Sequence, residues 1–353
     1  MFLSDGFSRR ILRAILVVRS DVVHYRMKRK SIIAASMLLS AASVAPSHDQ
    51  RADLLPKLQQ GQTLTYLIRF RGDKNVKTES NLVIPLAPAG SQVDTRGLLR
   101  VQILDVKQEG GKLSVHARSE FLVNDTSEPA SENASRKQEV MPQTLKPEGK
   151  SVEFTISSDG FTQKITGLDV LTSDQQQIWQ EWLARFAMAW EFPSPSAKIG
   201  DKWKIDQPEL APSPIALLTW TRDSSYVRDE PCAPAQLAIT GEVTPPNGSA
   251  GVCAVILTTA KLVQKSSAKD ATPADFRLHQ LKTMGTAKGS NEIITYISLS
   301  TGLVVRATED ATQQMDVVVA KADGSNGVRY NMDAKSRLEV LLLAQAPQAP
   351  PQR

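Results

Sequence analysis

Most of the chain alternates apolar and polar residues with a period of two, the pattern of strands that bury one face. Between Thr63 and Arg71, for example, every second residue is apolar, from Leu64 to Phe70. Other runs with this alternation predict strands at Lys112–Phe121, Val152–Ile156, Phe161–Thr166, Thr219–Val227, Gln236–Val243, Val252–Val263, Ile293–Leu299, Leu303–Thr308, Met315–Ala320, Val328–Met332 and Leu338–Leu343. Asp159-Gly160 separates two of these runs and predicts a hairpin. We therefore predict a mainly β fold of antiparallel strands.

One segment has the period of a helix instead. Ser173 can cap a helix over Asp174–Trp190, with acidic Asp174 at the positive end of the helix dipole. Apolar residues recur at spacings of three and four and form one stripe: Ile178, Trp179, Trp182, Leu183, Phe186 and Trp190. The stripe predicts either a core helix packed on a sheet, which is the simpler interpretation, or an aromatic box for a ligand.

Two blocks of the chain follow a similar order of features. Gly61 and Gly200 each precede polar residues and an aromatic residue that enters a strand, and each block has a hairpin near its end. We predict two related antiparallel modules of curved, half-barrel-like sheet, residues 48–192 with helix 173–190, and residues 193–343. Few residues are identical, so a chance similarity of hairpins is the alternative. Residues 344–353 are rich in Pro, Gln and Ala and predict a disordered tail.

Residues 1–47 have the features of an export leader. Met27–Lys30 is a short basic segment, and Ser31–Ala45 is an uncharged apolar run with the size of a signal-peptide core, too short for a typical membrane span. Met27 is the expected start. The alternatives are a short buried helix and a twin-arginine signal at Ser8–Arg10, although the apolar run after those arginines ends at Arg19. We expect an exported protein, periplasmic or secreted, with no transmembrane anchor.

The charge of the chain is concentrated in this leader. The chain has 42 basic and 37 acidic residues, of which eight and two lie in residues 1–47. The remainder therefore carries a net formal charge of −1, and its basic residues form no stripe interleaved with aromatic ones. We predict that nucleic acid is not a partner.

Cys232 and Cys253 are the only cysteines. In an exported chain an even pair predicts one disulfide, and the alternative is two unpaired thiols, one of them inside a strand. Too few histidines accompany the pair for a metal site, so we expect no metal and no cofactor.

The sequence contains no motif of a known hydrolase, metalloprotease, redox or nucleotide-binding site. His116 and His279 fit solvated side chains better than catalytic bases. Asp201 fits a turn residue that bonds its own backbone. The pattern thus favours a non-catalytic protein and leaves a hydrolase with an unrecognised site open.

Three motifs carry a resemblance to a known family. Lys57–Tyr66 contains K-x-x-x-G-x-x-x-x-Y, Asp159–Asp169 reads D-G-x-x-x-x-I-x-G-L-D, and Phe192–Trp203 reads F-P-x-x-x-x-K-x-G-D-x-W. Together they are similar to an uncharacterised family of exported bacterial proteins, a domain of unknown function, over most of residues 54–343. The resemblance implies a β-rich envelope protein and transfers no activity. The layout also resembles, at the level of fold, the half-barrels of periplasmic lipoprotein carriers.

We consider three functions. The first is an exported, non-catalytic binding or carrier protein for an apolar small molecule or lipid held between sheet and helix. The residues expected to line its site are Tyr66, Phe70, Ile178, Trp182 and Phe186. The second is a structural or interaction protein of the envelope that meets a protein partner through an edge strand or an apolar patch. The third is the hydrolase mentioned above.

Overall fold

The computed structural model describes part of the chain. The described ranges are 51–80, 89–109, 112–124, 145–157, 162–188, 196–209, 213–237, 243–244 and 251–344. They belong to one compact unit that runs from Ser47 to Arg353. The predicted leader, the predicted turn at Asp159-Gly160, Trp190 and residues 345–353 of the predicted tail lie outside the described ranges.

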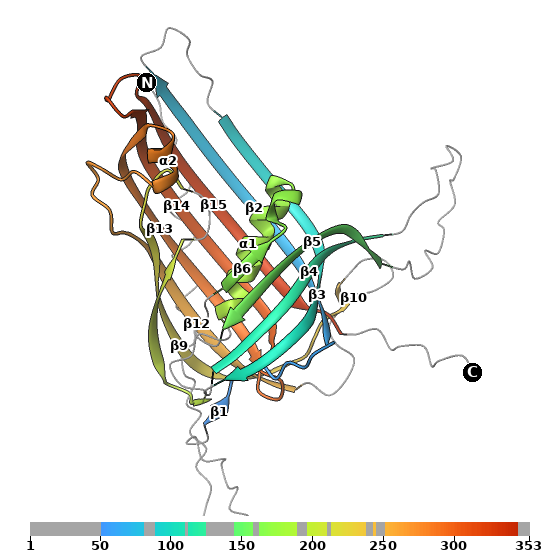
Figure 1. Ribbon diagram of the computed structural model, residues 1–353. Coiled ribbons are helices and arrows are strands. Elements are labelled where there is room, and N and C mark those ends of the chain that lie inside the picture. The colour runs from blue at the N-terminus through green and yellow to red at the C-terminus, as the bar shows by residue number, and fades with distance from the viewer. Residues whose placement is uncertain are drawn as a thin grey trace, which may run out of the picture. The chain divides into compact units, whose positions relative to one another are not determined.

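The described chain folds into one large sheet, two small sheets and three helical segments (Figure 1). The strands are β1 (Ala52–Asp53), β2 (Thr63–Ser80), β3 (Ala89–Glu109), β4 (Lys112–Asn124), β5 (Leu145–Ser157), β6 (Thr162–Thr166), β7 (Ser196–Ala197), β8 (Lys202–Pro208), β9 (Leu218–Cys232), β10 (Gln236–Leu237), β11 (Val243–Thr244), β12 (Gly251–Gln264), β13 (Leu281–Ser298), β14 (Val304–Lys321) and β15 (Val328–Leu342). The helical segments are the 3-10 turn η1 (Leu168–Val170), α1 (Ser173–Met188) and α2 (Ala274–Leu278).

The large sheet is antiparallel and has eleven strands in the order β6-β5-β4-β3-β2-β15-β14-β13-β12-β9-β8. The mainly β prediction is therefore confirmed. Strands β2 to β6 form one half of the sheet, β8, β9 and β12 to β15 form the other, and the halves join where β15 pairs with β2. The internal repeat remains a prediction. Within the described ranges, the edge strands β6 and β8 do not pair with each other, so the sheet is open.

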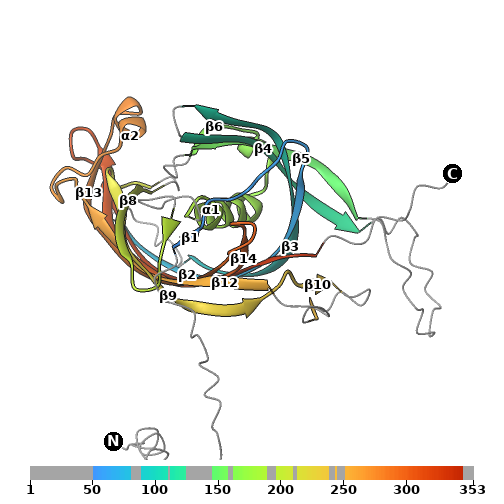
Figure 2. The same ribbon diagram turned by 90° about the horizontal axis from the view of Figure 1, so that it is seen from below.

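Helix α1 lies inside the curve of this sheet (Figure 2), and we call the face that it covers the inner face. The helix begins with a reciprocal pair of bonds: the amide of Gln175 donates to Oγ1 of Thr172 over 3.3 Å, and the amide of Thr172 donates to Oε1 of Gln175 over 3.1 Å. This is a capping box, so Thr172 is the cap and the prediction of Ser173 is wrong by one residue. The indole of Trp179 donates to Oγ of Ser119 in β4 over 2.7 Å and fixes the helix to the sheet.

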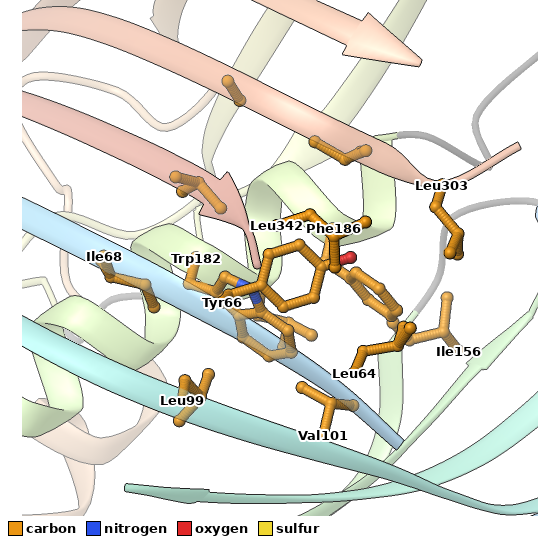
Figure 3. Packing of buried hydrophobic residues seen from close by; sticks show 14 of the residues in the cluster. Leu64, Tyr66, Ile68, Leu99, Val101, Ile156, Trp182, Phe186, Leu303 and Leu342 are labelled. Atoms are coloured by element: carbon orange, nitrogen blue, oxygen red, sulfur yellow. The ribbon is translucent and has the colours of Figure 1, made fainter. Parts of the chain in front are cut away.

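The apolar stripe of α1 packs into the main core on the inner face (Figure 3). Trp182 is fully buried, and its ring stacks on Phe186 at a centroid distance of 5.1 Å. Tyr66 of β2 meets both rings, at 6.1 Å and 6.2 Å. The aromatic stripe is therefore a core helix packed on a sheet, the simpler of the two interpretations.

Several strands are longer than the alternation predicts. The two predicted segments Leu303–Thr308 and Met315–Ala320 are one strand, β14, and Val328–Met332 and Leu338–Leu343 likewise merge into β15. Sequence alternation did not predict β3 at all. The register of β3 against β4 shifts between Ile103 and Asp105, and such a bulge reverses the phase of the alternation.

The predicted disulfide between Cys232 and Cys253 is confirmed, with a Cα–Cα distance of 5.7 Å. It joins the end of β9 to the start of β12, and the next residue of β12, Ala254, belongs to the main core.

A cavity on the inner face of the sheet

The inner face carries a second apolar cluster beyond the part that α1 covers. This second cluster lies on the N-terminal halves of β13 and β15 and on the C-terminal half of β14. It includes Met315 and Val317, and Tyr330 packs against it. Between it and α1 is a cavity of about 690 Å³. Strands β2, β8, β9, β13, β14 and β15 and both α helices contribute to its lining. We take this cavity as the candidate functional site.

Small residues create the space on the sheet side. Gly72 of β2 pairs with Ser336 of β15, and Ser336 pairs with Ala311 of β14, so three adjacent strands present small side chains in one row. We call these three residues the small-residue row. A Cβ atom on Gly72 would lie 3.1 Å from the ring of Phe70, which occupies the adjoining space. Because no long side chain rises from this row, the main core and the second cluster do not merge.

The next strand continues the row with polar residues that are buried. Asn291 of β13 pairs with Ala311, and its amide group donates to Oε1 of Glu309. Arg222 of β9 lies two strands further along the row, where Ala260 pairs with both Arg222 and Asn291. The exposed fractions of Arg222 and Glu309 are only 4% and 3%. These two opposite charges therefore lie close to the cavity in a largely water-excluded part of the sheet.

Trp220 of β9 forms part of the cavity wall. Its indole nitrogen donates to Oε2 of Glu209 over 2.8 Å, which orients the ring. The ring crosses β12: atom Cη2 lies 3.0 Å from the point that a Cβ atom on Gly289 of β13 would occupy. Glycine at position 289 thus provides the surface on which the tryptophan ring rests.

The side of α1 that faces the cavity is rich in amide side chains. Gln176, Gln177, Gln180 and Glu181 line the cavity, whereas Trp182 on the other side of the helix is buried in the core. The amide of Gln176 donates to the carbonyl of Leu168 over 2.8 Å, so this part of the wall is held in place.

Of the five residues predicted to bind a ligand, one lines the cavity. Phe70 contributes to its wall. Tyr66, Ile178, Trp182 and Phe186 are buried in the main core together with Phe70. Burial raises the pKa of the Tyr66 hydroxyl above its ordinary range, which keeps that group neutral. That these residues bind a ligand stays a prediction, and the structure brings a different set of residues to the cavity.

The sequence does mark the residues that line the cavity, because the apolar alternation is interrupted where they occur. In β14 the inward positions between Ala307 and Met315 are Glu309, Ala311 and Gln313. Because these residues interrupt the apolar pattern, the alternation predicted two short strands where the structure has the single strand β14. A gap in the inward apolar pattern of a long strand was thus the mark of the cavity, although sequence alone does not show that neighbouring strands have their gaps in register.

The other chemical candidates lie elsewhere. Oδ2 of Asp201 accepts a bond from the amide of Lys198 over 3.0 Å, which confirms its role in a turn. His279 bonds the carbonyl of Asp275 and His116 faces Glu153, and neither histidine lines the cavity. In the part of the chain that the structure describes, His, Cys, Asp and Glu side chains form no cluster suited to a metal ion. Neither α helix of that part combines the length and the apolar content needed to span a membrane.

Comparisons with known proteins give no family. No family model and no curated protein matches the sequence. A solved structure described as "a putative lipoprotein from Parabacteroides distasonis ATCC 8503" is similar at 8% identity and a TM-score of 0.21, over 83% of this chain and 98% of that one. A second, OccK7 (OpdD) of Pseudomonas aeruginosa, is similar at 7% identity and a TM-score of 0.13, over 80% of this chain and 100% of that one. Likeness at these TM-scores identifies no function.

Proposed function

We propose that this chain is an exported, non-catalytic binding or carrier protein of the bacterial envelope, and that it holds an apolar or amphipathic small molecule in the cavity of the inner face. The observation that carries the proposal is the cavity of about 690 Å³ between α1 and the second cluster. Ligand pockets have volumes of roughly 300–1,000 Å³, mostly apolar walls and a few polar groups. Met315, Val317 and Trp220 supply such a wall.

Export is supported by two features of the chain. Met27–Ala45 has the order of a basic segment followed by an uncharged apolar run, as in a signal peptide. The disulfide between Cys232 and Cys253 suits an oxidising compartment. The three motifs described above support membership of the uncharacterised family of exported proteins.

Native mass spectrometry tests the binding function, on protein purified under mild conditions from the envelope of the cells that produce it. We expect excess mass that organic extraction removes. A clean unliganded mass, with no uptake from a lipid extract, would contradict the proposal.

A pair of variants locates the bound molecule. Ala311→Phe adds a large ring in the small-residue row, so it should abolish most ligand uptake while the sheet remains folded. Gln314→Phe is the matched control, because Gln314 is exposed on the opposite face of the same strand. Equal uptake by both variants would show that the ligand lies outside the cavity.

A further inference from the structure

We propose that the ligand is a neutral amphiphile whose head carries several hydroxyl groups, the simplest example being a glycoside of a fatty chain. This inference rests on the proposed function and specifies its ligand. The structure assigns the head to the amide-lined part of the cavity beside Trp220, and the apolar chain to the second cluster around Met315 and Val317.

The first argument is the number of amide side chains in the lining that make no hydrogen bond to another part of the described protein. Gln177 and Gln180 of α1, Gln207 of β8 and Gln313 of β14 all line the cavity. Within the described residues, none of these four side chains makes a hydrogen bond or another recorded polar contact. An amide both donates and accepts, and so does a hydroxyl, so a head with several hydroxyl groups can satisfy these side chains in either direction.

The second argument is the position of Trp220 among these amides. Trp220 pairs directly with Gln207, and its ring extends over β12 toward Gly289, which is the direct partner of Gln313. Trp220 is half-buried, and its indole nitrogen is held by Glu209. The ring therefore offers a fixed, flat apolar surface beside an amide, which suits the C–H face of a sugar ring.

The third argument concerns charge. The described lining contains three basic and four acidic side chains, a net formal charge of −1. The two most buried charges, Arg222 and Glu309, have opposite signs. No single sign dominates, so a charged head would lose its water without a compensating field, whereas a neutral head loses less.

The apolar chain has its own place next to the head. In β14, Gln313 is followed on the same face by Met315, Val317 and Val319, all of which line the cavity. The lining thus changes from amide to aliphatic along one strand, which is the distribution that an amphiphile requires.

Calorimetric titration with octyl compounds, each kept below its micelle concentration, tests the inference. The probes are octyl glucoside, 1-octanol, octyl sulfate and octyltrimethylammonium, which share one chain and differ in the head. We expect octyl glucoside to bind most tightly. Gln313→Leu should weaken glucoside binding about tenfold, the equivalent of one or two hydrogen bonds, and leave octanol binding unchanged. Gln314→Leu, the adjacent amide on the outward face, should change neither.

The outcomes separate this inference from the proposed function. Equal affinities for all four heads, tightest binding of the sulfate or the ammonium compound, or equal effects of Gln313→Leu and Gln314→Leu would overturn the neutral, hydroxyl-bearing head and leave a binding protein. Failure of every octyl compound to bind would overturn both.

Discussion

The inner face of one sheet has two regions with opposite properties. Under α1 the aromatic residues of helix and strands fill the space, with Trp182 fully buried and its ring 5.9 Å from that of Phe154. Beyond the small-residue row the same strands border a cavity of about 690 Å³. Both regions have apolar strands, so hydrophobic content does not distinguish them. The difference lies in whether a helix presents rings or amides to the sheet.

The largest expected effect is the contrast in stability between the two regions. Trp182→Ala should lower the free energy of unfolding by about 3–5 kcal/mol, because the surrounding core cannot collapse into the space. Met315→Ala should lower it by only about 2 kcal/mol, the low end of the range for such a change, because Met315 already borders empty volume. Urea denaturation of both variants measures the difference. Equal losses would show that the cavity region is packed as tightly as the core.

The disulfide tests a part of the sheet that lies away from the cavity. Replacing Cys232 and Cys253 by serine should lower the free energy of unfolding by about 3 kcal/mol, since the bond closes a loop with a sequence separation of 21. Ligand affinity should not change, because neither cysteine lines the cavity. Thermal unfolding and a binding titration of the double variant, compared with the unaltered protein, measure the two quantities. A large loss of ligand affinity would mean that the loop closed by the disulfide influences the shape of the cavity.

Gly289→Ala tests the region around the cavity. A Cβ atom there would lie 2.9 Å from the carbonyl oxygen of Thr312 and 3.0 Å from the ring of Trp220, so both the backbone at Thr312 and the ring must move slightly. We expect a stability loss of about 1–2 kcal/mol and altered fluorescence of Trp220. The control is Ser290→Ala, at the adjacent exposed position. Identical fluorescence spectra for the two variants would refute the contact between ring and glycine.

The smallest expected effect concerns the outer face behind the cavity. Arg329 donates two bonds to the carboxylate of Asp316, at 2.8 Å and 2.7 Å, and these bonds lower the pKa of Asp316. The pair therefore stabilises the fold above the ordinary pKa of an aspartate, about 3.9, and this contribution is lost as the pH falls through the lowered pKa. Both side chains are partly exposed, so water screens the pair and its contribution to stability is small.

Asp316→Asn measures that contribution by difference. Its unfolding free energy should lie below that of the unaltered protein at neutral pH, and the difference between the two should shrink as the pH falls below the ordinary pKa of an aspartate, about 3.9. A constant difference over the whole range would mean that the ion pair does not titrate as described.

Sequence patterns predicted those parts of the fold in which a single periodicity or a single pair of residues determines the structure. The stripe from Ile178 to Phe186 predicted a core helix, and the pair of cysteines, on the expectation of export, predicted the disulfide. The cavity required something that a single chain does not display. Gly72, Ser336 and Ala311 are adjacent only because β2, β15 and β14 pair in one register, and their sequence positions do not reveal that register.

The pairing of β2 with β15 also dictates when the protein can complete its fold. Arg69 and Glu339 form an ion pair across these strands, although 270 positions separate them in the chain. The centre of the sheet therefore cannot form until β15 has been synthesised. Contacts this distant make folding slow, because the entropy of closing the loop is lost before the contacts form. A chain that folds late remains extended long enough to be threaded through a membrane, which is compatible with the export that we propose.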